Sequence, residues 1–121
     1  MAKLLIIDDS FVARMMIRKV LESADHEVLE ASDGNEGMIL IEEKKPDAVL
    51  LDLLMPGESG EAVLLRLRKH FPSLPVIVLS ADIQETTRER CIRSGANGFV
   101  SKPPHPDTLL PAVAMLFQST R

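Results

Sequence analysis

The chain has 121 residues, of which 45% are hydrophobic and 26% charged, as in an ordinary globular domain. Fourteen basic and 18 acidic residues give a net charge of −4, which argues against a nucleic-acid-binding surface. The apolar run near the N-terminus is too short for a signal peptide or a membrane span, and the single cysteine cannot form an internal disulfide. We therefore expect one cytoplasmic domain over residues 1–121, with no nucleic-acid or membrane partner.

Strand-like and helix-like segments alternate five times along the chain. The expected strands are Lys3–Ile7, Glu27–Ala31, the apolar run that ends at Asp52, Val76–Leu79 and Gly98–Ser101. The expected helices are Ser10–Leu21, Asn35–Lys44, a third that begins after Gly60, Gln84–Ser94 and Thr108–Gln118. This alternation predicts an α/β fold, a doubly wound parallel sheet with right-handed crossovers.

Proline restricts where the last helix can begin. Inside a helix, Pro111 would remove a hydrogen bond and clash with the preceding turn, at a cost of about 3 kcal/mol. A start with Thr108 as the N-cap would place Pro111 in the first turn, where its missing N–H is harmless.

Polar residues follow four of the five expected strands. Asp8 and Asp9 come after the first strand, Asp52 ends the third, Ser80 ends the fourth and Lys102 follows the fifth. Parallel strands of one sheet bring all five residues to the same edge, where ligands bind in open α/β sheets. This edge is the predicted functional site.

Three carboxylates that lie close together repel one another, and one of them would be driven to protonate unless a cation sits among them. The candidate ligands are all oxygens, with no histidine or cysteine nearby, so the ion is expected to be Mg²⁺ or Mn²⁺. Ser80 and Lys102 then provide a hydroxyl and an ammonium across from Asp52. That arrangement suits a tetrahedral anion, with an Asp52 carboxylate oxygen as the nucleophile.

These five positions resemble those of a response-regulator receiver domain of the CheY type, in its stand-alone form, over essentially the whole chain. Further matching positions are Met55-Pro56, Gly60 and the run Gly95–Phe99. The resemblance implies a flavodoxin-like (βα)5 three-layer sandwich with the strand order 2-1-3-4-5, the order known for CheY itself.

The resemblance also implies how a metal would be held. Asp9 and Asp52 would ligate Mg²⁺ directly, the backbone carbonyl of Leu54 would be the third protein ligand, and Asp8 would act mostly through metal-bound water. Lys102 would pair with Asp52 at rest and with the phosphoryl group afterwards. The Lys102–Pro103 peptide bond is expected to be cis, which X–Pro bonds permit at modest cost.

Two further roles follow from the resemblance. Ser80 would swing to donate to a phosphoryl oxygen, and Phe99 stands where the family has a switch aromatic that turns inward with it. The alternative is that Phe99 is an ordinary core residue. Leu54 and Asp82 depart from the common pattern at positions that flank the path of the attacking water, so the sequence does not set the lifetime of the phosphoryl group.

The function implied is that of a phosphoacceptor in a two-component phosphorelay. A histidine kinase or phosphotransfer protein would supply the phosphoryl group. The surface of the fourth helix, fifth strand and fifth helix would signal to a downstream protein or phosphatase. The chain would be a monomer or weak dimer, and it would catalyse only its own phosphorylation and dephosphorylation.

Other function classes fit the sequence less well. A small Mg²⁺-dependent aspartyl phosphatase of the haloacid-dehalogenase group needs an Asp-x-Asp pair after one strand, whereas Asp8 and Asp9 are adjacent and Asp52 lies on another strand. An interaction-only receiver would lack at least one of the five groups. A nucleotide- or flavin-binding protein would need a glycine-rich loop after the first strand, which this sequence does not have.

The first helix has more apolar residues than one stripe requires. The expected core-facing stripe is Ala13, Met16, Ile17 and Val20. Phe11, Val12 and Met15 are then left on the adjoining outward face, within two turns of Asp9. They are either scattered surface hydrophobes or a docking patch for a helix of the phosphodonor or of a phosphatase.

Overall fold

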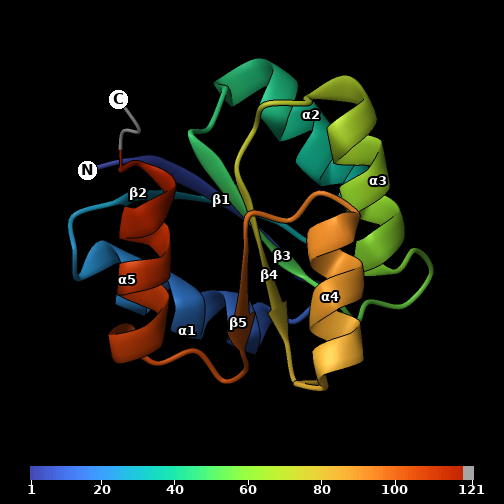
Figure 1. Ribbon diagram of the computed structural model, residues 1–121. Helices are drawn as coiled ribbons and strands as arrows, with labels where there is room; N and C mark the ends of the chain where they lie inside the picture. Colours follow the sequence, from blue (N-terminus) through green and yellow to red (C-terminus); the bar gives the residue numbers. More distant parts are fainter. Residues whose placement is uncertain (119–121) are drawn as a thin grey trace.

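The computed structural model describes residues 1–118 and contains one parallel sheet in the order β2-β1-β3-β4-β5 (Figure 1). The strands are β1 Lys3–Ile7, β2 Glu27–Ala31, β3 Ala48–Asp52, β4 Val76–Ser80 and β5 Gly98–Ser101. The helices are α1 Phe11–Glu22, α2 Gly34–Lys44, α3 Gly60–His70, α4 Glu85–Arg93 and α5 Pro106–Leu116. The predicted doubly wound α/β class and its strand order are therefore confirmed.

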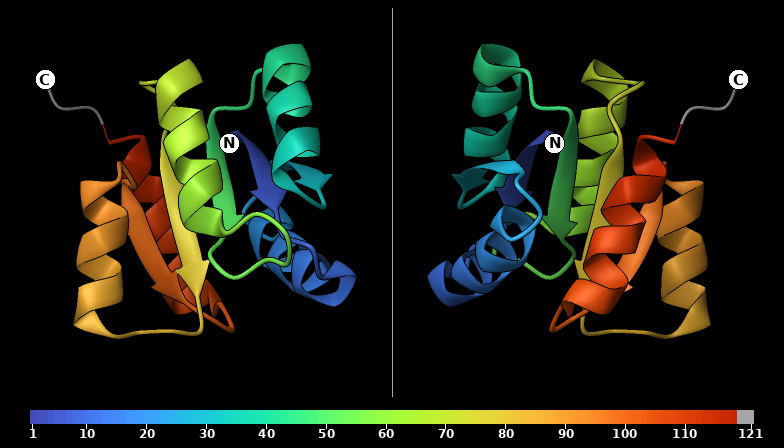
Figure 2. Two further views of the ribbon diagram at one scale, coloured as in Figure 1. Left: turned by 90° about the vertical axis from the view of Figure 1, so that its right-hand side faces the viewer. Right: turned by 90° about the vertical axis from the view of Figure 1, so that its left-hand side faces the viewer.

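Helices cover both faces of the sheet, which gives three layers (Figure 2). Residues of α1 and α5 share one apolar cluster with alternate sheet residues such as Leu50. Residues of α2, α3 and α4 share the other cluster with the intervening sheet residues such as Leu51. Because β3 is central and covered on both sides, every one of its residues is buried, including Asp52. The unbroken apolar sequence before Asp52 reflects this position.

Short polar side chains set where three of the helices begin. Ser10, Asp33 and Ser59 each accept a hydrogen bond from a backbone N–H in the first turn of α1, α2 and α3 respectively. These caps lie at the edge of the sheet where the strands end. They therefore fix the loops that follow β1, β2 and β3.

The predicted start of the last helix is wrong. α5 begins at Pro106, with His105 as the N-cap, so Thr108 lies within the first turn and Pro111 lies inside the helix. Pro106 already occupies the first turn, where a backbone N–H would have no intrahelical partner, so the proline loses no hydrogen bond there. Pro111 and Asp107, the residue whose carbonyl loses its intrahelical partner, are both exposed, and the buried Leu109 and Val113 anchor the helix on the sheet.

The predicted core stripe of α1 is also partly wrong. Ile17 and Leu21 are its buried residues, whereas Met16 is 45% exposed. Phe11, Val12 and Met15 are exposed, as expected. The apolar surface of α1 is thus larger than the sequence indicated, because Met16 adds to it.

Candidate functional site

The parallel ladder continues past the strand ends and fixes the backbone at the site. The Asp8 N–H donates to the Ala31 carbonyl at 3.1 Å, and the Lys102 N–H donates to the Ser80 carbonyl at 2.9 Å. Gly60 packs so closely against the backbone of Asp52 that a side chain there would clash with it. The functional side chains therefore project from a backbone that the sheet holds in place.

The three predicted carboxylates do come together. Asp8, Asp9 and Asp52 each present an oxygen, and these oxygens all lie within 4.8 Å of one another. Asp8 and Asp52 are buried, at 1% and 4% exposure, whereas Asp9 is exposed. The exposed Asp9 leaves the cluster accessible from solvent.

Lys102 lies between the two buried carboxylates. Its Nζ donates to Asp8 Oδ2 at 2.9 Å and to Asp52 Oδ1 at 3.2 Å. Burial alone would lower the pKa of Lys102, but the hydrogen bond and charge of Asp8, followed by those of Asp52, raise it. Burial and the neighbouring charge of Asp8 raise the pKa of Asp52, and Lys102 offsets only part of that shift. The cluster thus carries more negative charge than its one ammonium balances.

The donor set fits a hard divalent cation. Every candidate side-chain ligand in the cluster is a carboxylate oxygen, the donor that Mg²⁺ and Mn²⁺ prefer. The Leu54 N–H donates to Asp52 Oδ1 at 3.4 Å, so this stretch of backbone lies beside the acceptor carboxylate. Leu54 is 64% exposed, and its apolar side chain cannot supply a ligand to the site.

Ser80 is buried at the end of β4. It belongs to a hydrogen-bond network around Asp82 that the sequence did not reveal. Its Oγ accepts a hydrogen bond from the Asp82 N–H at 2.9 Å. The Asp82 carboxylate accepts from the Gln84 N–H and, at 2.8 Å, from the Thr87 hydroxyl, and these bonds lower its pKa. Thr87 is buried on a mostly polar α4. A threonine five residues after an aspartate was the signal available, but it is too common to be decisive.

The resemblance to receivers also implied a switch role for Phe99 and a cis peptide bond between Lys102 and Pro103. Phe99 is half-buried in β5 and packs against the apolar cluster under α2, α3 and α4. That position is compatible with either a core role or a switch role. The Lys102–Pro103 bond is cis, as expected.

The comparison with known proteins decides the family. Residues 4–114 match the model of the response regulator receiver domain. The chain is a receiver domain.

Relatives of similar length support this assignment. The receiver is 36% identical over 115 residues to protein PilH of Pseudomonas aeruginosa, covering 93% of this chain and 95% of PilH. It is 39% identical over 114 residues to chemotaxis protein CheY of Listeria monocytogenes, covering 93% and 96%. The crystal structure of CheY4 of Vibrio cholerae superposes with a TM-score of 0.89 at 29% identity, covering 96% of this chain and 98% of that one. Among residues 1–118, no helix has the length and apolar character to cross a membrane.

The raised pKa of Asp52 predicts a pH-dependent cost to stability. Its ordinary value is 3.8, and the folded receiver binds its proton more tightly than the unfolded chain does. The free energy of unfolding contributed by Asp52 therefore falls as the pH rises through the interval between the two values. In Mg²⁺-free buffer, we expect Asp52→Asn to be more stable than the unaltered receiver, by a margin that grows as the pH rises above the ordinary value of 3.8.

Urea unfolding followed by circular dichroism at several pH values measures this margin. Mg²⁺ should narrow it, because a bound cation removes part of the cost of the ionised carboxylate. A margin that stays constant over the whole pH range would contradict the raised pKa.

Proposed function

We propose that this receiver accepts a phosphoryl group on Asp52, in the presence of Mg²⁺, from a histidine kinase or a phosphotransfer protein. The observation that carries the proposal is the buried Asp52 carboxylate, hydrogen-bonded to Lys102 and within 4.8 Å of two further carboxylates. A structural role does not account for such a cluster, because three carboxylates that share a single ammonium repel one another and cost stability.

The transfer is a displacement at phosphorus. An Asp52 oxygen forms the new O–P bond, the bond from phosphorus to the donor breaks, and the donor keeps that electron pair. Lys102 faces Asp52 Oδ1 and favours the ionised carboxylate that attacks. Its three N–H donors also suit the oxygens of the incoming group. The backbone that carries Asp52 does not have to move, because β3 holds it within the sheet.

The receiver offers a defined set of oxygens for the metal. Asp9, Asp52 and the Leu54 carbonyl would hold Mg²⁺ directly, and Asp8 would act through a bound water, with Mn²⁺ as the alternative ion. The metal supplies positive charge that offsets the carboxylates and the phosphoryl oxygens. Asp8 is already engaged by Lys102, which fits its more distant role.

Ser80 and Phe99 would report the change to the rest of the molecule. To donate to a phosphoryl oxygen, Ser80 has to turn and give up the hydrogen bond from the Asp82 N–H. That bond belongs to the loop that leads into α4, so the loop can respond. The surface of α4, β5 and α5 would then present a different shape to a downstream protein or phosphatase.

The two other function classes receive less support. An enzyme that turns over small phosphate esters needs a substrate pocket, whereas the surface beside Lys102 is an open, mostly apolar cleft. An interaction-only module has no need of the five groups. We propose that the receiver catalyses only its own phosphorylation and dephosphorylation. We place it in the cytoplasm, with which the buried free thiol of Cys91 is compatible.

Labelling with acetyl phosphate tests the proposed function. With Mg²⁺, the mass of the intact receiver should rise by one phosphoryl group, and Asp52→Asn should not be labelled. Lys102→Ala should slow labelling on the order of 100-fold, as is typical when one preorganised charge is removed. Mass spectrometry is the suitable readout, because the chain has no Trp or Tyr whose fluorescence could report the reaction.

Asp25→Asn is a matched control. Asp25 is exposed in a left-handed turn before β2. It lies away from the carboxyl ends of the strands, where the site is, and asparagine tolerates the left-handed conformation. It should label like the unaltered receiver. Undiminished labelling of Asp52→Asn would show that the phosphoacceptor is another residue.

The exposed apolar residues of α1 are proposed as the docking patch for the phosphodonor. Phe11 and Met15 are 65% and 44% exposed. Beside them, Met16 lines a cleft of about 300 Å³ that reaches Lys102, Pro103 and Pro104. A protein that delivers a phosphoryl group to Asp52 has to contact the surface around this edge, and an apolar helix of the donor would cover the patch.

Replacing both Phe11 and Met15 by alanine should separate protein donors from small ones. Transfer from a histidine kinase or phosphotransfer protein that phosphorylates the unaltered receiver should slow by roughly tenfold or more, the loss expected of interface anchors. Labelling by acetyl phosphate should be unchanged. Ile39→Ala with Leu65→Ala, at exposed positions of α2 and α3, is the control and should affect neither reaction. Equal loss with both donors would mean that Phe11 and Met15 serve the fold.

A further inference from the structure

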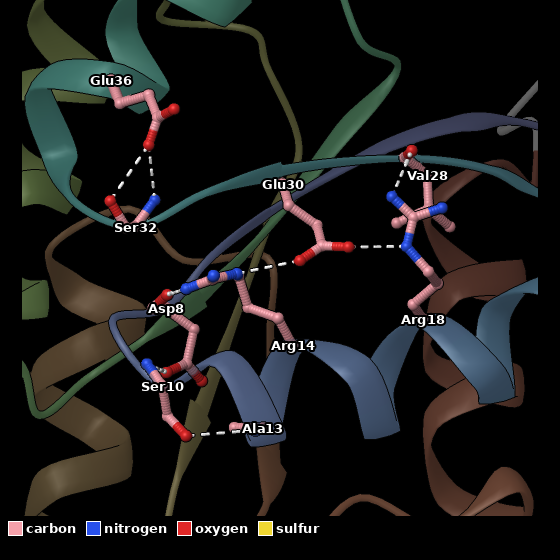
Figure 3. A network of polar contacts seen from close by, with 9 residues as sticks. All are labelled: Asp8, Ser10, Ala13, Arg14, Arg18, Val28, Glu30, Ser32 and Glu36. Atoms are coloured by element: carbon pink, nitrogen blue, oxygen red, sulfur yellow. Dashed lines mark hydrogen bonds and ion pairs between the residues drawn. The ribbon is translucent and has the colours of Figure 1, made fainter.

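A network of charged side chains joins α1 and β2 to the segment that carries the metal-binding carboxylates (Figure 3). Arg14 Nη1 donates to the Asp8 backbone carbonyl at 2.6 Å, and Arg14 Nε donates to Glu30 at 2.8 Å. Glu30 also accepts from Arg18 at 2.6 Å. The Arg14 side chain is only 14% exposed, compared with 34% for Arg18. Arg14 is thus the member of the network that reaches the site, and Glu30 holds it there.

The contact with Arg14 completes the restraint on Asp8. The Asp8 N–H donates to Ala31, its Oδ1 accepts from the Ser10 N–H, and its Oδ2 accepts from Lys102. Only the carbonyl then remains, and Arg14 fixes it.

That carbonyl belongs to the peptide unit that joins Asp8 to Asp9, so its orientation sets the direction in which Asp9 leaves the strand. Within residues 1–118, no hydrogen bond holds the Asp9 side chain itself. Asp9 therefore depends on this peptide unit for its place in the cluster.

We propose that Arg14, held by Glu30, is a positioning residue for the metal site: it orients the Asp8–Asp9 peptide so that Asp9 can bind the cation. This inference rests on the proposed function, because it assumes that the cluster binds Mg²⁺. Arg14 touches neither the cation nor the phosphoryl group. It acts through the backbone, by its hydrogen bond to the Asp8 carbonyl.

The guanidinium is suited to this role and an ammonium is not. Its planar fork places one N–H on Glu30 and another on the Asp8 carbonyl at the same time. The Arg14 guanidinium also lies 5.9 Å from the ring centre of Phe11. A lysine at this position could bond to one acceptor or the other, but it would not fix their relative orientation.

The sign of the effect separates positioning from simple electrostatics. A cation near the cluster repels Mg²⁺, so removing the Arg14 charge alone would tighten Mg²⁺ binding. Loss of positioning would weaken binding, by roughly 10-fold or more, as found for residues that orient metal ligands. The two explanations therefore predict opposite changes in the same quantity.

Titration of the receiver with MgCl₂, followed by the amide NMR shifts of Asp9 and its neighbours, measures the dissociation constant without any phosphorylation. Arg14→Ala should raise this constant roughly 10-fold or more. Arg14→Lys keeps the charge and should still raise it several-fold, and it decides the matter if the alanine variant does not fold. Arg18→Ala is the matched control: it removes the other guanidinium bound to Glu30, without a contact to Asp8, and should leave the constant within about twofold.

Dissociation constants for both Arg14 variants that equal or fall below that of the unaltered receiver would overturn this inference alone. A loss of similar size in Arg18→Ala would overturn it too, since the effect would then belong to the network's charge. If the unaltered receiver showed no saturable Mg²⁺ binding, the proposed function would fail and this inference with it.

Discussion

The site depends on one ammonium shared by two buried carboxylates. Lys102 bonds to both Asp8 and Asp52, residues that lie 94 and 50 positions away in sequence. Three different strands have to take their places in the sheet before this contact can form. The ammonium compensates for part of the negative charge at this edge of the sheet, and under the proposed function the remaining charge would be met by a divalent cation. The chemistry of the site thus follows from an imbalance that the fold maintains.

This imbalance costs stability, and the surrounding structure offsets the cost. β3 is covered by helices on both faces and anchors Asp52 through a fully buried strand. Backbone hydrogen bonds extend the sheet beyond the strand ends at Asp8 and Lys102. A rigid frame of this kind lets charged groups remain close together without the relaxation that would otherwise separate them. It also allows Asp9 to stay exposed while its backbone is held.

Much of this could be read from the sequence, for a physical reason. The strand positions and the residues at their ends follow from local patterns, because a strand buried on both faces is apolar and its polar terminus stands out. The meeting of Asp8, Asp9 and Asp52 then follows from parallel topology, and the resemblance to receivers added the strand order. The family assignment from the five strand-end groups is confirmed by the match over residues 4–114.

Other features depend on tertiary contacts that local patterns do not record. α5 begins earlier than expected because Pro106 starts it and buried leucine and valine residues anchor it, despite Pro111. Met16 lies at helical spacing from Ala13 and Val20, yet it lines the cleft near Pro104 and is not buried in the core. The contacts of Arg14 in α1 with the Asp8 carbonyl after β1 and with Glu30 in β2 have no sign in the sequence that would predict them.

Binding of beryllofluoride, a mimic of the phosphoryl group, is the most direct test of the central claim that this edge receives a phosphoryl group on Asp52. With Mg²⁺ present, amide NMR should show saturable binding, with the largest shifts at Asp52, Lys102 and Ser80 and a change at Phe99 in β5. Asp52→Asn should abolish these shifts. Equal binding by Asp52→Asn, or no Mg²⁺-dependent binding by the unaltered receiver, would contradict the account.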